Sequence, residues 1–336
     1  MKNYTPRDAK WFRDSKYGLF FHFLPGGNSR QVNHAVDNFD VEAFSEDCAR
    51  CGAGYVFITL GQNSGYYCSP NSTYDHYTGA KPGEKTTRRD LPADLFDALN
   101  KRGMKMMLYF PALAPKEDAK AAAGLGCIDK GKPSWADDNW ESDWNVTPAF
   151  IKRWSDVIKE YALRYGEKLS GWWFDGCYEW NGFNDEVAEP YMKALKSGND
   201  NSLAAFNPMA QLLKRNSVFE DYTAGEWEDF LSVNLPGENG QIDGIQWHQL
   251  SFLGKWWGAG ELRYTNAQII DHIKTVSDLG GVITLDLPLD VNYSGTRIRP
   301  DVLAQMEAVK KAIRISEHQK LTKTTLHDCS PHPWPA

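Results

Sequence analysis

The chain has 336 residues, of which 42% are hydrophobic and 24% are charged, a balance typical of globular proteins. Its formal net charge of −7 gives no electrostatic reason to expect nucleic acid or an anionic membrane as a partner. No apolar stretch approaches the ~20 residues of a membrane span, and the first eight residues lack the apolar core of a signal peptide. We therefore expect a cytoplasmic protein, or a periplasmic or secreted one if a signal has been removed. The sequence leaves the oligomeric state open.

Short apolar runs alternate with segments of helical periodicity along most of the chain. The runs predict eight strands, at residues 17–24, 54–60, 104–110, 172–175, 202–207, 218–222, 243–248 and 282–288. The helical segments are 41–51, 91–102, 148–165, 185–196, 265–279 and 299–313. This alternation predicts an α/β fold with a parallel sheet, and eight strands favour a closed (β/α)8 TIM barrel. We expect one barrel domain over residues 1–314 and a short tail over 315–336, without a C-terminal β-sandwich.

The fourth predicted strand ends abruptly in a carboxylate. Leu169-Ser170-Gly171-Trp172-Trp173-Phe174 is followed by Asp175 and Gly176. A charge is costly among aromatic side chains but is suited to the C-terminal rim of a barrel, where catalytic groups lie. An Asp-Gly turn or a helix cap explains the same pair without any catalytic role.

Polar and aromatic residues follow the other predicted strands, and in a barrel they converge on one face. They are His22, Gln62, Asn63, Tyr109, Asn207, Asp221, Glu226, Glu228, Trp247, His248 and Asp286. This set suits a neutral polyhydroxylated ligand better than a phosphate. His22 also fits a merely hydrogen-bonded strand end, and Trp247 also fits core packing.

Two long loops, 61–89 and 111–146, are expected to wall the pocket, because loops at this end of a barrel carry function. The second contains Trp135, Trp140 and Trp144 in a polar setting, which favours a platform for stacking a sugar ring.

The six cysteines do not form a recognisable disulfide framework. Cys48 and Cys51 have C-x-x-C spacing, but they lie in a predicted helix, so packing is favoured over a metal or redox role. A metal-dependent barrel enzyme is a weaker interpretation, and its ligands would come from His22, His34, His76 and His248.

Five segments together resemble the α-L-fucosidases of glycoside hydrolase family 29. They are the opening strand Trp11 to His22, the segments Arg89-Asp90-Leu91 and Lys101 to Lys105, the strand ending in Trp173-Phe174-Asp175-Gly176, and the last strand Gly280 to Pro288. The order and the spacing agree over most of residues 11–314.

The resemblance implies a retaining exo-glycosidase that works by double displacement and needs no cofactor or metal. It implies that Asp175 is the nucleophile and that Glu226 is the acid/base, with Glu228 and then Glu179 as alternatives. It also implies an oligosaccharide or glycoconjugate substrate. The expected substrate-binding residues are His22, Gln62, Asn63, Tyr109, Trp173, Asn207, Trp247 and His248.

Two segments depart from the family pattern. Gln62-Asn63 stands where the family usually has two adjacent histidines, and Trp247-His248 stands where it has Trp-Glu. Amides still pair with sugar hydroxyls, because they both donate and accept hydrogen bonds. The departures leave two other interpretations open: a glycosidase for a sugar other than fucose, or a catalytically silent carbohydrate-binding protein on a degenerate barrel.

Overall fold

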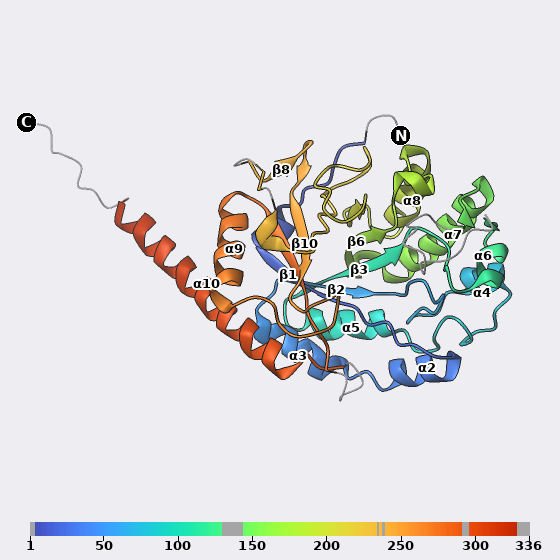
Figure 1. Cartoon of the computed structure of the whole chain (residues 1–336), viewed down its shortest axis with the longest axis horizontal. Helices are drawn as coiled ribbons and strands as arrows, with labels where there is room; N and C mark the ends of the chain where they lie inside the picture. The colour runs from blue at the N-terminus through green and yellow to red at the C-terminus, as the bar shows by residue number, and fades with distance from the viewer. Residues whose placement is uncertain (1–3, 130–143, 234, 237–238, 291–295, 328–336) are drawn as a thin grey trace, which may run out of the picture.

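The computed structural model of the chain describes residues 4–129, 144–233, 235–236, 239–290 and 296–327. Its centre is a curled sheet of seven parallel strands in the order β10-β11-β1-β2-β3-β6-β7 (Figure 1). Their bounds are Tyr17–Phe21 (β1), Tyr55–Thr59 (β2), Lys105–Pro111 (β3), Leu169–Asp175 (β6), Leu203–Phe206 (β7), His248–Phe252 (β10) and Val282–Asp286 (β11). The protein is therefore an α/β protein with a barrel-like parallel core.

Helices surround this sheet (Figure 1). They are α1 (Lys10–Asp14), α2 (Ser29–Asp37), α3 (Val41–Cys51), α4 (Ser72–Thr78), α5 (Leu91–Asn100), α6 (Ala119–Gly124), α7 (Pro148–Tyr165), α8 (Asp185–Lys196), α9 (Asn266–Asp278) and α10 (Pro300–His327). Short 3-10 turns lie at η2 (Gly166–Lys168), η3 (Glu179–Asn181) and η4 (Phe230–Ser232). Two small antiparallel pairs are β4 (Ile128–Asp129) with β5 (Trp144–Asn145), and β8 (Gln241–Ile242) with β9 (Ile245–Gln246).

Side-chain caps set where several of the helices begin. The Asp40 carboxylate accepts from the Ala43 N–H at the start of α3, and Thr147 Oγ1 accepts from the Phe150 N–H at the start of α7. Such caps satisfy N–H groups that have no partner inside the helix. The predicted helices at 41–51, 148–165 and 185–196 are confirmed with the same bounds.

The strands bury both of their faces, which produces two separate cores. Along β6, Trp172 and Phe174 point outward to the large core beneath the helices, whereas Trp173 points into the curl of the sheet. This alternation follows from the two-residue period of a strand. Phe12 of α1 covers the N-terminal end of the inner core, where its ring lies 4.9 Å from that of Tyr222. Phe12 therefore closes the inner core at the N-terminal ends of the strands.

The segment between β7 and β10 forms hydrogen bonds with both of these edge strands. The Asp221 N–H donates to Ala204 O of β7 at 2.9 Å, and the Trp227 N–H donates to Leu250 O of β10 at 2.8 Å. The prediction of a regular strand over 218–222 is wrong, because one of the backbone-to-backbone hydrogen bonds that a strand there would make with β7 is replaced by a bond to a side chain. The Asp221 carboxylate itself accepts from the Ala204 N–H at 2.9 Å.

The seventh predicted strand, 243–248, is displaced along the chain. Asp243 and Gly244 have φ angles of +50° and +81°, so they form a tight turn that joins β8 to β9. Positive φ at both central residues is typical of a hairpin turn. The parallel strand β10 begins only at His248, with polar residues on its buried faces.

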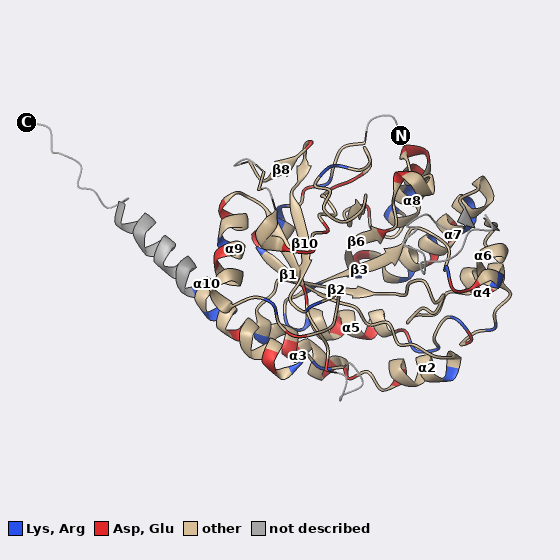
Figure 2. Ribbon diagram, in the orientation of Figure 1, with Lys and Arg blue, Asp and Glu red and all other residues tan. Residues whose placement is uncertain are grey.

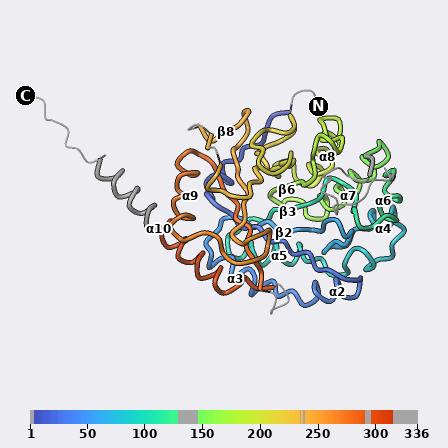
Figure 3. Tube along the Cα trace, in the orientation of Figure 1, coloured from blue at the N-terminus to red at the C-terminus, as the bar shows by residue number. Residues whose placement is uncertain are grey.

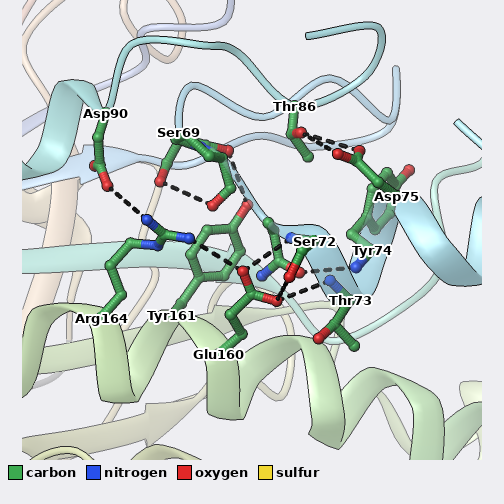
Figure 4. Close-up of polar contacts among 12 residues, drawn as sticks. Ser69, Ser72, Thr73, Tyr74, Asp75, Thr86, Asp90, Glu160, Tyr161 and Arg164 are labelled. Atoms are coloured by element: carbon green, nitrogen blue, oxygen red, sulfur yellow. Dashed lines mark hydrogen bonds and ion pairs between the residues drawn. The ribbon is translucent and has the colours of Figure 1, made fainter. Parts of the chain in front are cut away.

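The loop over residues 61–89 contains α4 and is fixed to α7 (Figure 4). Glu160 of α7 accepts hydrogen bonds from the N–H groups of Ser72 and Thr73, each at 2.8 Å. Arg164 lies 3.1 Å from Glu160 and 3.5 Å from Asp90, which joins α7 to the start of α5. A carboxylate at the N-terminus of α4 also complements that helix's dipole.

The chain ends differ from the expected short tail. The N-terminal segment runs beside the end of α8 (Figure 3), where Arg7 pairs with Asp200 at 2.7 Å. The closing helix α10 continues to His327, well past the predicted end at 313.

Charged residues of both signs are spread over the outer helices (Figure 2). Cys48 and Cys51 are free and buried on α3.

Candidate active site

A cavity of about 460 Å³ lies at the C-terminal ends of the strands. It is lined by Phe20, His22, Leu24, Gln62, Tyr109, Trp173, Asp175, Tyr178, Glu226, Leu250, Trp256 and Trp257. A smaller cavity of about 100 Å³ shares Gln62, Tyr109, Asp175 and Tyr178 with the first, and it is also lined by Asn63. Polar groups therefore converge on an aromatic-walled hollow, the usual form of a small-molecule site.

Asp175 ends β6 and receives hydrogen bonds on both oxygens. Oδ2 accepts from the Tyr109 hydroxyl at 2.6 Å, and Oδ1 accepts from the Gly176 N–H at 2.8 Å. The Tyr178 hydroxyl donates a longer bond of 3.4 Å to Oδ1. Gln62 Nε2 in turn donates to the Tyr109 hydroxyl at 2.7 Å. Donors on both oxygens orient the carboxylate.

Tyr109 keeps its proton in this network. Burial, followed by the nearby charge of Asp175, raises the pKa of Tyr109 well above its ordinary value. Its ring also stacks on that of Trp173, with centroids 5.5 Å apart. Trp173 is fixed by its indole N–H, which donates to Ala224 O at 3.0 Å.

One side-chain amide joins Asp175 to Glu226. Asn207, directly after β7, uses Nδ2 to donate to Asp175 Oδ1 at 3.0 Å and to Glu226 Oε2 at 2.6 Å. Burial, and then the charge of Asp175, raises the pKa of Glu226 to about 8, although the Asn207 bond opposes the rise. The arrangement thus places a readily protonated carboxyl group, that of Glu226, beside the carboxyl group of Asp175 at the same cavity.

A buried carboxylate organises the opposite wall. Asp286 is the last residue of β11 and is fully buried. Its Oδ1 atom lies 3.1 Å from His22 Nδ1. Its Oδ2 atom accepts a hydrogen bond from the Gly258 N–H in the turn after β10. Burial raises the pKa of Asp286, and its contact with His22 opposes that shift.

The sequence matches the family described as alpha-L-fucosidase over residues 28–308. This match covers most of the chain. The chain belongs to the alpha-L-fucosidase family. A comparison with curated protein sequences finds no significant match.

Solved structures with the same fold include alpha-L-fucosidases and an endo-fucoidan hydrolase. A family 29 alpha-L-fucosidase from Bacteroides thetaiotaomicron, solved as a trapped covalent intermediate, has a TM-score of 0.66 and 17% identity, covering 93% of this chain and 76% of its own. The alpha-L-fucosidase AlfC from Lactobacillus casei, in complex with α-L-fucose, has a TM-score of 0.62 and 16% identity, covering 92% and 99%.

The endo-fucoidan hydrolase belongs to glycoside hydrolase family 107. It has a TM-score of 0.69 and 19% identity, and the alignment covers 90% of this chain and 53% of the hydrolase. The chain thus spans about half the length of that protein. At this identity the likeness concerns the fold alone.

Within this alpha-L-fucosidase family member, two expected sugar-binding residues lie away from the cavity. Trp247 and His248 stand at the start of β10, the end opposite the cavity, and both are fully buried. The two ring nitrogens of His248 lie 3.0 Å from Thr223 O and 2.7 Å from Thr284 Oγ1, and burial lowers the pKa of His248 to about 3. The expectation that these two residues contact the ligand is wrong, because the strand begins where it was expected to end.

The two alternative acid/base candidates are exposed. Glu228 lies two residues after Glu226 on the outer side, and Glu179 lies in η3. Neither lines the cavities that contain Asp175. Among the three glutamates considered, only Glu226 shares a hydrogen-bond donor with Asp175.

Several residues that line the cavity were not predicted from the sequence. Tyr178 follows Asp175 by three positions, and Trp256 and Trp257 lie in the turn after β10. The signal for the pair was present, since two tryptophans and a glycine stand four to six positions after the end of β10 at Phe252, but the strand itself was misplaced. Among the described residues of the loops 61–89 and 111–146, only the first few line the cavities. Trp135 and Trp140 lie outside the described residues.

Within the described part of the chain, no group of three or more His, Cys, Asp or Glu side chains is arranged to hold a metal ion. In the same residues, no helix has the length and apolar character needed to cross a bilayer.

Proposed function

We propose that this protein is a retaining, exo-acting α-L-fucosidase that removes terminal L-fucose from an oligosaccharide or glycoconjugate. The observation that carries the proposal is the single amide nitrogen of Asn207, which lies within 3.0 Å of an oxygen of Asp175 and of an oxygen of Glu226. The two oxygens are therefore separated by less than twice that distance. Retaining glycosidases hold their two carboxyl groups about 5–5.5 Å apart, whereas inverting enzymes need a wider gap for water.

Glu226 has the properties required of the general acid. Its pKa of about 8 keeps it protonated at neutral pH, ready to transfer a proton to the leaving oxygen. Asn207 donates to Oε2, which therefore acts as an acceptor and leaves the proton on Oε1. Among the described residues no other side chain donates to Glu226, so Oε1 is left available to the substrate.

Asp175 has the properties required of the nucleophile. Oδ1 accepts from Gly176 and Asn207, while Oδ2 accepts a short bond from Tyr109 alone and keeps a lone pair for the substrate. In the first step Oδ2 bonds to the anomeric carbon, the glycosidic bond breaks, and the leaving oxygen takes the proton of Glu226. In the second step Glu226 takes a proton from water, the hydroxide oxygen bonds to the anomeric carbon, and the ester to Asp175 breaks. Two inversions give retention.

The fold and the pocket support this assignment. The hydrogen bonds from Asp221 to β7 and from Trp227 to β10 support a closed eight-stranded barrel, in which residues 1–314 form one catalytic unit. His22, Gln62, Asn63 and Tyr109 offer hydrogen bonds to sugar hydroxyls, and Trp173 offers an apolar face.

Covalent trapping tests the proposal. Incubation with 2-fluoro-fucosyl fluoride should inactivate the enzyme and add one 2-fluoro-fucosyl group to the peptide that contains Asp175, as measured by mass spectrometry. Hydrolysis of nitrophenyl α-L-fucoside should exceed hydrolysis of the other nitrophenyl glycosides in a panel. Binding of fucose without labelling or turnover would contradict the proposal and favour a carbohydrate-binding protein.

A further inference from the structure

An exposed tryptophan stands at the rim of the candidate active site. Trp256 lines the main cavity, yet 59% of its surface remains accessible to solvent. Its neighbour Trp257 lies deeper, with its ring 5.6 Å from that of His22. A large aromatic side chain that remains exposed at a polar pocket is a common feature of ligand-binding surfaces.

The turn that carries Trp256 is firmly held. Trp256 and Ala259 exchange two backbone hydrogen bonds, at 3.2 and 3.1 Å. The Gly258 N–H is bound by Asp286, and Arg299 Nη1 donates to Gly260 O at 2.6 Å. Gly258 has a φ of +62°, and an added Cβ would lie 3.1 Å from His22 Cβ. The buried Asp286 therefore fixes both His22 and the turn, so that the exposed indole has a fixed position relative to the pocket.

The order of elements around the rim puts Trp256 on the side of Glu226. Glu226 pairs with Leu250 of β10, and the turn with Trp256 directly follows that strand. Asp175 ends β6, and β7 separates it from the segment that carries Glu226. In a double displacement the leaving group departs toward the acid and away from the nucleophile. The sugar that leaves would therefore be next to Trp256.

We propose that Trp256 forms an acceptor subsite that stacks against the ring of the sugar to which L-fucose is attached. The inference rests on the proposed function and goes further, because it specifies a substrate class in which fucose is linked to another pyranose. A pyranose ring presents C–H groups on one face, and burying that face against an indole is favourable.

Two substrates that share the fucosyl group but differ in the leaving group separate this subsite from the chemistry. α-L-Fucosyl fluoride has no sugar in the acceptor position, whereas a fucosylated disaccharide fills it. The variants are Trp256→Ala, Trp256→Phe and a control, Leu163→Ala, which removes an apolar side chain of similar exposure (56%) from the outer helix α7.

The measured quantity is kcat/KM for the disaccharide divided by kcat/KM for the fluoride. Trp256→Ala should lower this ratio about tenfold or more, the effect of losing one aromatic stacking contact. Trp256→Phe should recover part of the loss, and Leu163→Ala should leave the ratio unchanged.

Three outcomes would overturn the inference. An unchanged ratio in Trp256→Ala would show that the indole does not contact the leaving sugar. A change from oligomer to monomer in Trp256→Ala, with the ratio unchanged, would assign the indole to a contact between two copies of the chain. Failure of the wild-type enzyme to hydrolyse the fluoride would contradict the proposed function itself, and the inference with it.

Discussion

Glu220 and Glu226 lie on the same connection between β7 and β10, and burial raises the pKa of each to about 8. Their surroundings differ. Glu220 Oε1 accepts from the Phe206 N–H at 2.7 Å, and its Oε2 accepts from the N–H groups of Asn216 and Ser217. Glu226 lines the cavity and accepts from one amide, that of Asn207.

The comparison shows that a raised pKa does not by itself identify a catalytic acid. The three backbone donors fix Glu220 as a structural group that holds the turn before Asp221 against β7. Glu226 keeps an oxygen for the ligand and is close to a second carboxylate. Glu226, and not Glu220, is therefore the candidate acid, because it lines the cavity and has an oxygen without a hydrogen-bond donor among the described residues.

The largest effect is expected outside this pair, at the nucleophile. Asp175→Ala removes the atom that forms the intermediate, so kcat should fall at least about 10⁴-fold for every fucoside, whatever the leaving group. Rates with nitrophenyl fucoside and fucosyl fluoride measure this, and circular dichroism checks the fold. Residual activity of more than a few per cent on either substrate would move the nucleophile to another residue.

The next largest effect is expected for Glu226, where the loss of activity should depend on the leaving group of the substrate. Glu226→Ala should lower kcat/KM about 10²–10⁴-fold for disaccharides and much less for activated aryl fucosides, which need little protonation. Azide should accelerate the variant on the aryl substrate and give a fucosyl azide of retained configuration. Glu228→Ala and Glu179→Ala are the controls and should show no such dependence; its appearance in either would transfer the acid role there.

Glu220 should affect stability instead of chemistry. In Glu220→Gln an amide NH₂ replaces an acceptor that faces backbone N–H groups, and the free energy of unfolding should fall by about 1–3 kcal/mol. Urea unfolding at pH 6 measures the change. Full stability with lost activity would reverse the roles assigned to the two glutamates.

Glu226→Gln should change how stability depends on pH. The pKa of Glu226 in the folded state lies above its ordinary value of 4.5, so its contribution to stability is complete below about pH 4.5 and is lost as the pH rises through about 8. Glu226→Gln should therefore flatten the fall in melting temperature between pH 6 and 9. An unchanged slope would mean that Glu226 is not buried as described.

The smallest effect concerns Asn207, whose hydrogen bond opposes the rise in the pKa of Glu226. Asn207→Ala should shift the basic limb of the kcat/KM profile to higher pH. Asn216→Ala is a matched control, because the Asn216 amide donates to Cys177 O at 2.8 Å and contacts neither carboxylate. A limb that stays in place in Asn207→Ala would contradict the bridging role.

Much of the candidate site could be predicted from the sequence, because several of its residues lie at the ends of strands that the apolar runs predict. Tyr109, Asp175 and Asn207 each follow an apolar run that does form a parallel strand, so their convergence follows from the topology. Glu226 follows no such run, because its segment is joined to the edge strands by isolated bridges. It was reached through the resemblance to a family.

The errors have local physical causes. The apolar residues Ile245 and Trp247 suggested a strand that starts at 243, five residues before β10 starts at His248. Strand β10 itself carries buried polar residues such as Gln249, which bonds to His272 at 2.8 Å. That error placed Trp247 and His248 at the rim and concealed Trp256. The link from Asp286 to the Gly258 N–H is a tertiary contact between distant segments, and hydrophobic periodicity carries no information about it.

The most direct test of the contrast between the two glutamates is the pH dependence of kcat/KM with a fucosylated disaccharide, whose leaving group needs protonation. The wild-type enzyme should lose activity with a basic limb near pH 8, because Glu226 must be protonated to act as an acid. Glu220→Gln should keep that limb, and Glu226→Ala should lack it. A basic limb that persists in Glu226→Ala and disappears in Glu220→Gln would contradict the account.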